Sequence, residues 1–348
     1  YNTGYGTNSL MFNTTGACNT AVGFQALKTN STGYCNVAVG HLSLEQNTIG
    51  IDNVVIGSGA ARCNTTASQH VVIGTMALAC NTTGIENIAI GSRALCANVT
   101  GSCNTAIGRS ALRNNTADRN TALGYQAMVF NTIGCNNTSI GDRSMYSNTT
   151  GSFNTAIGSI TLFCNTIGSD NVAVGNYSLQ NNTTGNYNIA VGRAALYLNT
   201  TGSSNVAIGY ITLGNNTIGT GNTGTGESAL RNNTTGSYNT AIGYQSMYNN
   251  TIGERNTAVG LFSLLNNTTG VCNVGIGICA LRFNTIGTNN VAIGAISLYC
   301  NTTGIVNVAI GDGALFNNTT GSRNVAVGTR SLESHTGEGY NTALGACA

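Results

Sequence analysis

A single short phrase recurs along the whole sequence. Its glycines mark the period: the interval from Gly243 to Gly260 is 260 − 243 = 17, and the interval from Gly236 to Gly253 is the same. We number each coil from its asparagine, as N-(T/V)-A-(I/V)-G-x-x-(A/S)-L-x-x-N-T-(T/I)-G-x-x. Units of a repeat protein contact mainly their neighbours, so the repeat decides the fold before any single element does. The sequence therefore predicts one continuous array over residues 1–348.

The period slips once. The interval from Gly108 to Gly124 is 124 − 108 = 16, so one turn residue is missing near Ala117. The sequence opens at position 17 of a coil, with Tyr1, and stops at position 8, with Ala348. Because both ends fall inside a coil, we expect the chain to be a segment of a longer protein.

Seventeen residues are too few for a pair of helices but suit one turn of a β-solenoid. Positions 1 to 5, as in N-V-A-I-G, are typical of a strand because β-branched residues stand at positions 2 and 4. A second strand is expected around positions 8 and 9, and Gly at positions 5 and 15 is expected to supply the positive φ of tight turns. The predicted fold is all-β, a parallel β-solenoid or β-roll of about 20 coils (348/17).

Identical residues in stacked coils would lie about 4.8 Å apart. Asn at positions 1 and 12 would then form amide ladders, with His70 and His335 among the rare exceptions. We expect the core to be thin, with one Ile or Val at position 4, one Leu at position 9 and small residues at positions 3 and 8. The residues that represent these stacked columns are Asn239, Asn256, Gly243, Gly260, Ile242 and Leu264.

The strands are apolar or small on both faces, as in Asn171–Gly175 (NVAVG). Strands of this kind tend to be buried on both faces. One face can pack inside the coil, and the other can pack on a neighbouring chain. The pattern therefore favours self-association, although position 2 is Thr about as often as Val or Ile.

The run N-(T/V)-A-(I/V)-G-x-x-(A/S)-L, as in Asn205–Leu213 and Asn307–Leu315, resembles the head repeat of YadA-type trimeric autotransporter adhesins. It is also similar to tail-fibre repeats of phages and large viruses. This resemblance implies a left-handed β-roll, a homotrimer and a location outside the cell, on a cell surface or on a virion surface. It also implies a host-surface receptor or glycan as a partner. The coil here is longer than the usual adhesin coil, and the twelve cysteines are foreign to that family.

Composition excludes several classes of partner. Charged residues make up only 7% of the chain, against about 25% in ordinary domains. The net charge of +2 gives no basic patch for nucleic acid. There is no run of about 18 apolar residues, so we expect no membrane insertion.

The sequence lacks the motifs of an enzyme. The glycine runs Gly57–Arg62 and Gly219–Glu227 faintly resemble phosphate loops, but neither opens a helix within a βαβ unit. The three histidines stand at different coil positions, and the acidic residues occupy variable turns. We expect no catalytic, cofactor or metal site and no enzyme activity.

Four cysteines repeat at matching coil positions. Cys18 and Cys35 both stand at position 17, and Cys63 and Cys80 both stand at position 11, in each case one coil apart. Stacked Cα atoms about 4.8 Å apart lie within the disulfide range of roughly 4.4–6.8 Å. The two pairs are therefore candidate disulfides between coils. The alternative is that they are free thiols that replace Ser and Asn.

Asn-Thr-Thr sequons recur at position 12. In a secreted eukaryotic protein they would accept N-linked glycans. The alternative is a ladder of inward-pointing amides, which repetition in nearly every coil favours because a ladder needs every coil. The candidate glycosylation sites are Asn13, Asn81, Asn148 and Asn301.

Two classes of function remain. The first is a structural fibre or adhesin, a rigid rod that mediates attachment or stacks end to end into a filament. The alternative is an ice-binding (antifreeze) β-solenoid, since threonines at positions 2, 13 and 14 form columns. The alternation of Thr with Val at position 2 and with Ile at position 14 interrupts those columns, so the sequence favours the fibre.

Overall fold

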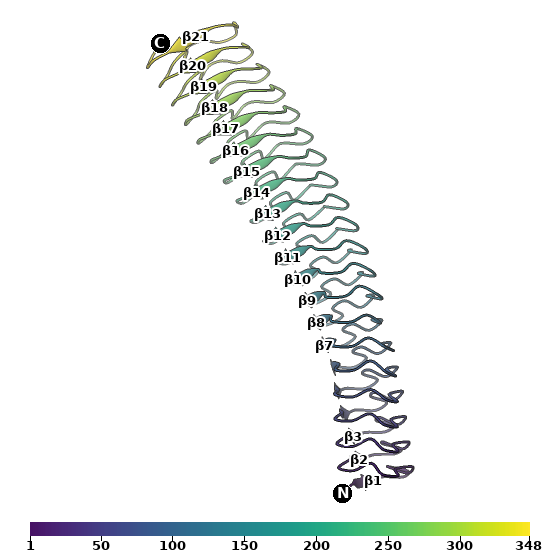
Figure 1. Cartoon of the computed structure of the whole chain (residues 1–348). Helices are drawn as coiled ribbons and strands as arrows, with labels where there is room; N and C mark the ends of the chain where they lie inside the picture. The colour runs from purple at the N-terminus through teal and green to yellow at the C-terminus, as the bar shows by residue number, and fades with distance from the viewer. The chain divides into compact units, whose positions relative to one another are not determined.

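A computed structural model describes residues 1–348, and the chain is all-β with one three-residue strand in each coil. It divides into two compact units, residues 1–171 and 172–348. Within each unit every strand pairs in parallel with the strand of the next coil, as Figure 1 shows. The strands of the first unit are β1 (Thr3–Tyr5), β2 (Thr20–Val22), β3 (Val37–Val39), β4 (Val54–Ile56), β5 (Val71–Ile73), β6 (Ile88–Ile90), β7 (Thr105–Ile107), β8 (Thr121–Leu123), β9 (Thr138–Ile140) and β10 (Thr155–Ile157).

The second unit has the same construction. Its strands are β11 (Val172–Val174), β12 (Ile189–Val191), β13 (Val206–Ile208), β14 (Thr223–Thr225), β15 (Thr240–Ile242), β16 (Thr257–Val259), β17 (Val274–Ile276), β18 (Val291–Ile293), β19 (Val308–Ile310), β20 (Val325–Val327) and β21 (Thr342–Leu344). The structure has no helix that could cross a membrane.

The strand register follows the sequence period. Thr240 of β15 lies opposite Thr257 of β16, which stands at the same position of the next coil. At the shortened coil Thr105 of β7 lies opposite Thr121 of β8, so the missing residue is absorbed in a turn and the register survives. The predicted parallel β-solenoid of about 20 coils is confirmed. Its left hand, and the continuity of one array across both units, stay predictions.

The predicted core was wrong at position 4. Ala241 at position 3 is fully buried, whereas Ile242 at position 4 is 42% exposed. Successive side chains of a strand point to opposite faces, so a buried position 3 turns positions 2 and 4 outward. The other predicted core positions are confirmed: the interior is filled by position 3, which is mostly Ala, a small residue at position 8 and Leu or Met at position 9, such as Leu264.

The predicted second strand around positions 8 and 9 does not form. Leu264 at position 9 has φ 50°, and Phe262 at position 7 has φ 55°, both in the left-handed region. The backbone N–H groups point alternately along the stack: that of Leu264 donates to Ala280 O in the next coil, at 2.9 Å, and that of Phe262 donates to Tyr244 O in the previous coil, at 3.2 Å. Full burial of the leucine side chain, worth about 2 kcal/mol, offsets the left-handed strain of about 1–2 kcal/mol.

Glycine recurs at positions 5 and 15 for different structural reasons. Gly243 at position 5 has φ 131°, as the turn prediction requires. Gly253 at position 15 has no positive φ, and the prediction of one there was wrong. A Cβ on Gly253 would lie 2.4 Å from Asn250 Oδ1 and 2.5 Å from Gly270 O, so close approach of the coils favours glycine; Ala67 is a buried exception at this position.

A fully buried amide ladder runs through position 12. Asn250 Nδ2 donates to Asn233 Oδ1 of the previous coil at 2.7 Å and to Gly253 O of its own turn at 3.0 Å. Its Oδ1 accepts from Asn267 Nδ2 of the next coil at 2.8 Å. The buried amide of Asn250 is therefore satisfied by the coils on either side, as burial of polar groups demands.

A second buried ladder runs through position 1. Asn239 Oδ1 accepts from the backbone N–H of Asn256 at 3.0 Å and from its Nδ2 at 3.2 Å. Asn239 Nδ2 also donates to Gly253 O at 2.8 Å, so the carbonyl of position 15 joins both ladders. This shared acceptor ties the two turns of a coil together.

The position 12 ladder has two interruptions. Asn98 Oδ1 is buried without a partner, because in the shortened coil Asn115 Nδ2 turns to Ala117 O at 2.7 Å. Asn318 Oδ1 is also without a partner, because the next residue of the column is His335. Each gap follows directly from a departure of the sequence from its repeat.

Asn250→Ala should lower the free energy of unfolding by about 2 kcal/mol, because it leaves Asn233 Oδ1 without a partner in the interior and leaves Asn267 Nδ2 with Gly270 O alone. The adjacent Asn249→Ala, on the half-buried position 11, is the matched control and should cost less than about 1 kcal/mol. Denaturant titration followed by circular dichroism measures both. Equal losses would contradict the structural role of the ladder.

Candidate functional site

The outward side chains at positions 2 and 4 form a surface that we call the outer strand face. No charged residue occupies either position in any of the strands. In β4 Val54 is 38% exposed and Ile56 is 40% exposed, and similar values recur in β12. Stacking thus places two columns of Thr, Val and Ile side chains on the surface of each unit.

The outer strand face is unusual for a soluble chain. Single exposed apolar residues are common, but contiguous patches above a few hundred Å² mark sites of interaction. Here the apolar side chains are contiguous because each stacks on its equivalent in the next coil, as Ile242 does on Val259. The side chains are β-branched and therefore stiff, so the surface needs little ordering to pack on a partner.

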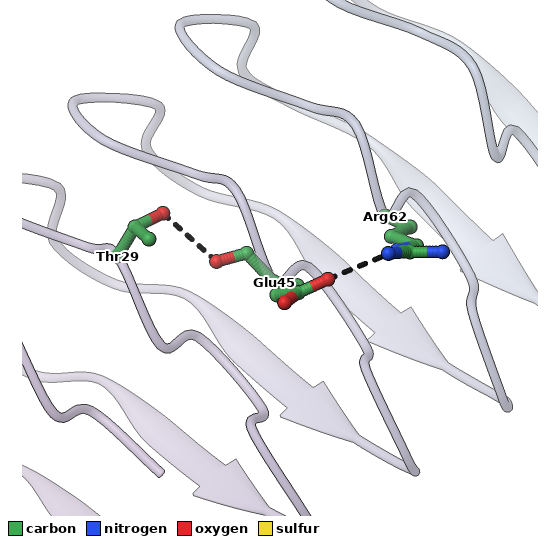
Figure 2. Close-up of polar contacts among 3 residues, drawn as sticks. All are labelled: Thr29, Glu45 and Arg62. Atoms are coloured by element: carbon green, nitrogen blue, oxygen red, sulfur yellow. Dashed lines mark hydrogen bonds and ion pairs between the residues drawn. The ribbon is translucent and has the colours of Figure 1, made fainter. Parts of the chain in front are cut away.

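A second surface is the edge formed by positions 10 and 11, where coils contact one another in two ways (Figure 2). Residues at the same position of adjacent coils stack directly, as Glu45 and Arg62 do in an ion pair of 2.9 Å. Residues one position out of step are diagonal neighbours: Thr29 Oγ1 at position 11 donates to Glu45 O at position 10 of the next coil, at 2.8 Å. The ion pair is solvent-exposed on the arginine side and contributes less than about 1 kcal/mol.

The diagonal contact adds a cysteine that sequence reasoning missed. Cys80 stacks on Cys63 at position 11, and its backbone N–H also donates to Cys96 O at position 10 of the next coil, at 3.1 Å. Burial, followed by the charge of Cys80, raises the pKa of both Cys63 and Cys96. The sequence could have indicated this contact if residues at position 11 had been compared with residues at position 10 of the next coil. The same relation brings Phe130 and Tyr146 together, with ring centroids 5.1 Å apart.

Cys18 and Cys35 lie on an exposed turn of the first coils. Partial desolvation, and then the neighbouring Cys18 thiol, raise the pKa of Cys35. All twelve cysteines are free thiols in the structure, so disulfides at Cys18–Cys35 and Cys63–Cys80 stay predictions.

The sequons lie within the position 12 ladder. Asn81, Asn148 and Asn301 are fully buried, and each Nδ2 donates to the neighbouring ladder residue and to the carbonyl at position 15. Asn13, at the first coil, donates to Gly16 O at 3.0 Å. Glycan attachment at the three buried sites would have to break both bonds, so glycosylation stays a prediction that requires modification before folding.

His70 replaces an asparagine in the position 1 ladder. Its Nδ1 accepts the backbone N–H of Asn87 at 3.1 Å, and its ring is also hydrogen-bonded to the backbone of Gly84. Because Nδ1 accepts, a neutral ring carries its proton on Nε2, from which it can donate to the Gly84 carbonyl. The same Nε2 lies 3.2 Å from Asn81 Nδ2, whose two hydrogens go to Asn64 Oδ1 and Gly84 O. Desolvation by burial lowers the pKa of His70 to about 4.

Of the glycine runs that resemble phosphate loops, Gly57–Arg62 lies in a turn of the coil, whereas Gly219–Glu227 contains strand β14. Gly57 has φ 138° and Gly226 has φ 122°, the conformation of every other position 5 glycine. No group of three or more His, Cys, Asp or Glu side chains in the structure is arranged to hold a metal ion.

No protein-family model matches the chain, and no curated protein matches it. The resemblance to adhesin heads and tail fibres therefore rests on the coil motif alone.

Acidification should destabilise the first unit through His70. The folded pKa lies below the ordinary value of 6.5, so the stability contribution is complete above pH 6.5 and is lost as the pH falls from 6.5 toward 4. A pKa shift of this size lowers the free energy of unfolding by roughly 3 kcal/mol at the acidic end of this pH range. His70→Asn restores the ladder residue and should remove this part of the pH dependence. Denaturant titrations of both proteins across this range measure it, and parallel pH profiles would contradict the account.

Oxidised glutathione should convert Cys18 and Cys35 into one disulfide, with reduction of one glutathione disulfide to two glutathione thiols. Cys80 should form a disulfide with Cys63 in some molecules and with Cys96 in others. Both reactions should accelerate with rising pH, because the thiolate attacks and burial raises the pKa values. Cys272, with no cysteine at the same position of an adjacent coil, should form only a mixed disulfide. Peptide mapping by mass spectrometry identifies the products. Glutathionylation of both Cys18 and Cys35 would contradict the predicted disulfide between them.

Proposed function

We propose that the protein is a structural fibre of a cell or virion surface, which associates side by side with copies of itself and mediates attachment. The observation that carries this proposal is the outer strand face, an uncharged surface of stacked Thr, Val and Ile side chains. Such a surface favours burial against a partner that carries the same columns.

Self-association fits the geometry of the repeat. Every copy of the chain presents the same columns, so a symmetric assembly can bury the outer strand face of all its members at once. The resemblance to adhesin heads favours three copies. The two buried amide ladders support rigidity, because bending a coil away from its neighbour would break several hydrogen bonds together.

Shape and reach, rather than catalysis, are the proposed role. The ionisable side chains lie scattered along the edges of the coils, and the one strongly shifted group, His70, is bonded within a ladder. Location outside the cell is part of the same proposal and is supported by the resemblance alone.

Ice binding is the competing proposal, and the regular threonine column at position 13 favours it. Thr251, Thr268 and Thr285 stack in this column. Each donates its hydroxyl hydrogen to the backbone carbonyl of the threonine one coil further on, at 3.0–3.1 Å. Those hydrogens are therefore not available to order water. A thermal hysteresis assay separates the two proposals, because a fibre that binds no ice produces none.

Ile242→Lys should break the lateral assembly, because it places a charge within the outer strand face that must be desolvated on association. Ile252→Lys is the matched control: its side chain is 52% exposed at position 14, away from that face. Sedimentation velocity should show a multiple of 35.5 kDa for the wild type and for Ile252→Lys, and a lower mass for Ile242→Lys. Very large particles in all three would indicate an end-to-end filament, and a monomeric wild type would refute lateral assembly.

A further inference from the structure

A groove of about 750 Å³ runs along the second unit between two columns of side chains. One wall is the position 11 column and the other is the position 13 column. The walls include Asn232, Asn249 and Asn266 on one side and Thr251, Thr268 and Thr285 on the other. No charged residue lines this groove, which we call the amide groove.

The asparagines of the amide groove are only partly used by the fold. Asn249 Nδ2 donates to Asn266 Oδ1 at 2.9 Å, and Asn249 Oδ1 accepts from Asn232 Nδ2 at 3.2 Å. An amide has two N–H donors and two acceptor lone pairs, so each of these side chains keeps one donor and one acceptor. Unlike the buried asparagines of position 12, these residues are half-exposed and can offer both groups to a ligand.

The amide row ends at an aromatic ring. The next residue of the column after Asn266 is Phe283, which is 39% exposed and lines the same groove. Phe283 is held edge-on against Tyr299, with ring centroids 5.0 Å apart, and the Arg282 guanidinium lies 5.6 Å from its centroid. These contacts fix the ring, so its exposed surface is available without further ordering.

We propose that the amide groove binds an extended, neutral, β-1,4-linked polysaccharide. A pyranose ring presents C–H groups that pack on an aromatic face and hydroxyl groups that pair with an amide donor and acceptor. The groove supplies both, together with the methyl groups of the threonine wall, and it carries no charge that would select an acidic ligand. Its amides repeat about every 4.8 Å, an interval comparable with the spacing of sugars along an extended chain.

This inference rests on the proposed attachment function and names the class of ligand. Isothermal titration calorimetry with cellohexaose, chitohexaose and maltohexaose tests it on the full chain. At least one of the two β-1,4-linked sugars should bind saturably. Maltohexaose should bind more weakly, because its α-1,4 linkages curl the chain away from a row of equally spaced amides.

Two groove variants and one matched control locate the site. Phe283→Ala should weaken binding about tenfold, and Asn249→Ala about fivefold. Phe130→Ala is the control, because Phe130 also stands at position 11, is 44% exposed and packs edge-on against a tyrosine, but does not follow a row of asparagines like the one that ends at Phe283. Its affinity should equal that of the wild type.

The inference is overturned if neither β-1,4-linked sugar binds, or if the two groove variants bind as tightly as the Phe130→Ala control. Sedimentation of the same samples keeps the result separate from the fibre proposal. Assembly without sugar binding would contradict the polysaccharide proposal and leave the fibre proposal standing. Sugar binding by a monomer would support the polysaccharide proposal and contradict lateral assembly.

Discussion

The two buried amide ladders are the interaction on which the rest of the structure depends. A coil of this size buries an alanine or at most a valine at position 3, a small residue at position 8 and, in most coils, one leucine or methionine at position 9. The asparagines of positions 1 and 12 add a polar interior in which the partners of each amide come from the coils before and after it. An isolated coil would leave these groups unsatisfied, so stability comes from stacking, as expected of a quasi-one-dimensional array.

The ladders also explain the tolerated irregularities. The residue lost near Ala117 leaves the strand register intact and costs one unpaired carbonyl oxygen, on Asn98. His70 keeps the position 1 ladder connected because a neutral imidazole can both accept and donate a hydrogen bond. The side chains at positions 10 and 11 vary from coil to coil, and this variation produces the amide groove and the row of cysteines at Cys63, Cys80 and Cys96.

The sequence predicted the repeat, the parallel register and the buried columns, because stacking turns a periodic sequence directly into spatial neighbours one coil apart. It failed where the backbone departs from simple alternation. Ile242 was expected inside, but strand alternation buries Ala241 and turns Ile242 outward. The sequence also missed the left-handed φ of Leu264 and its equivalents and the diagonal contacts between coils, such as Cys80 with Cys96, because neither follows from the propensities of single residues.

The most direct test of the account is hydrogen exchange of the asparagine side-chain amides by NMR in the folded protein. The account predicts slow exchange for the Nδ2 groups of positions 1 and 12, including Asn239 and Asn250, since both are buried and hydrogen-bonded between coils. The amides of position 11, such as Asn249, should exchange quickly because they are half-exposed. Rapid exchange at every asparagine would contradict the ladders, and with them the stacked fold.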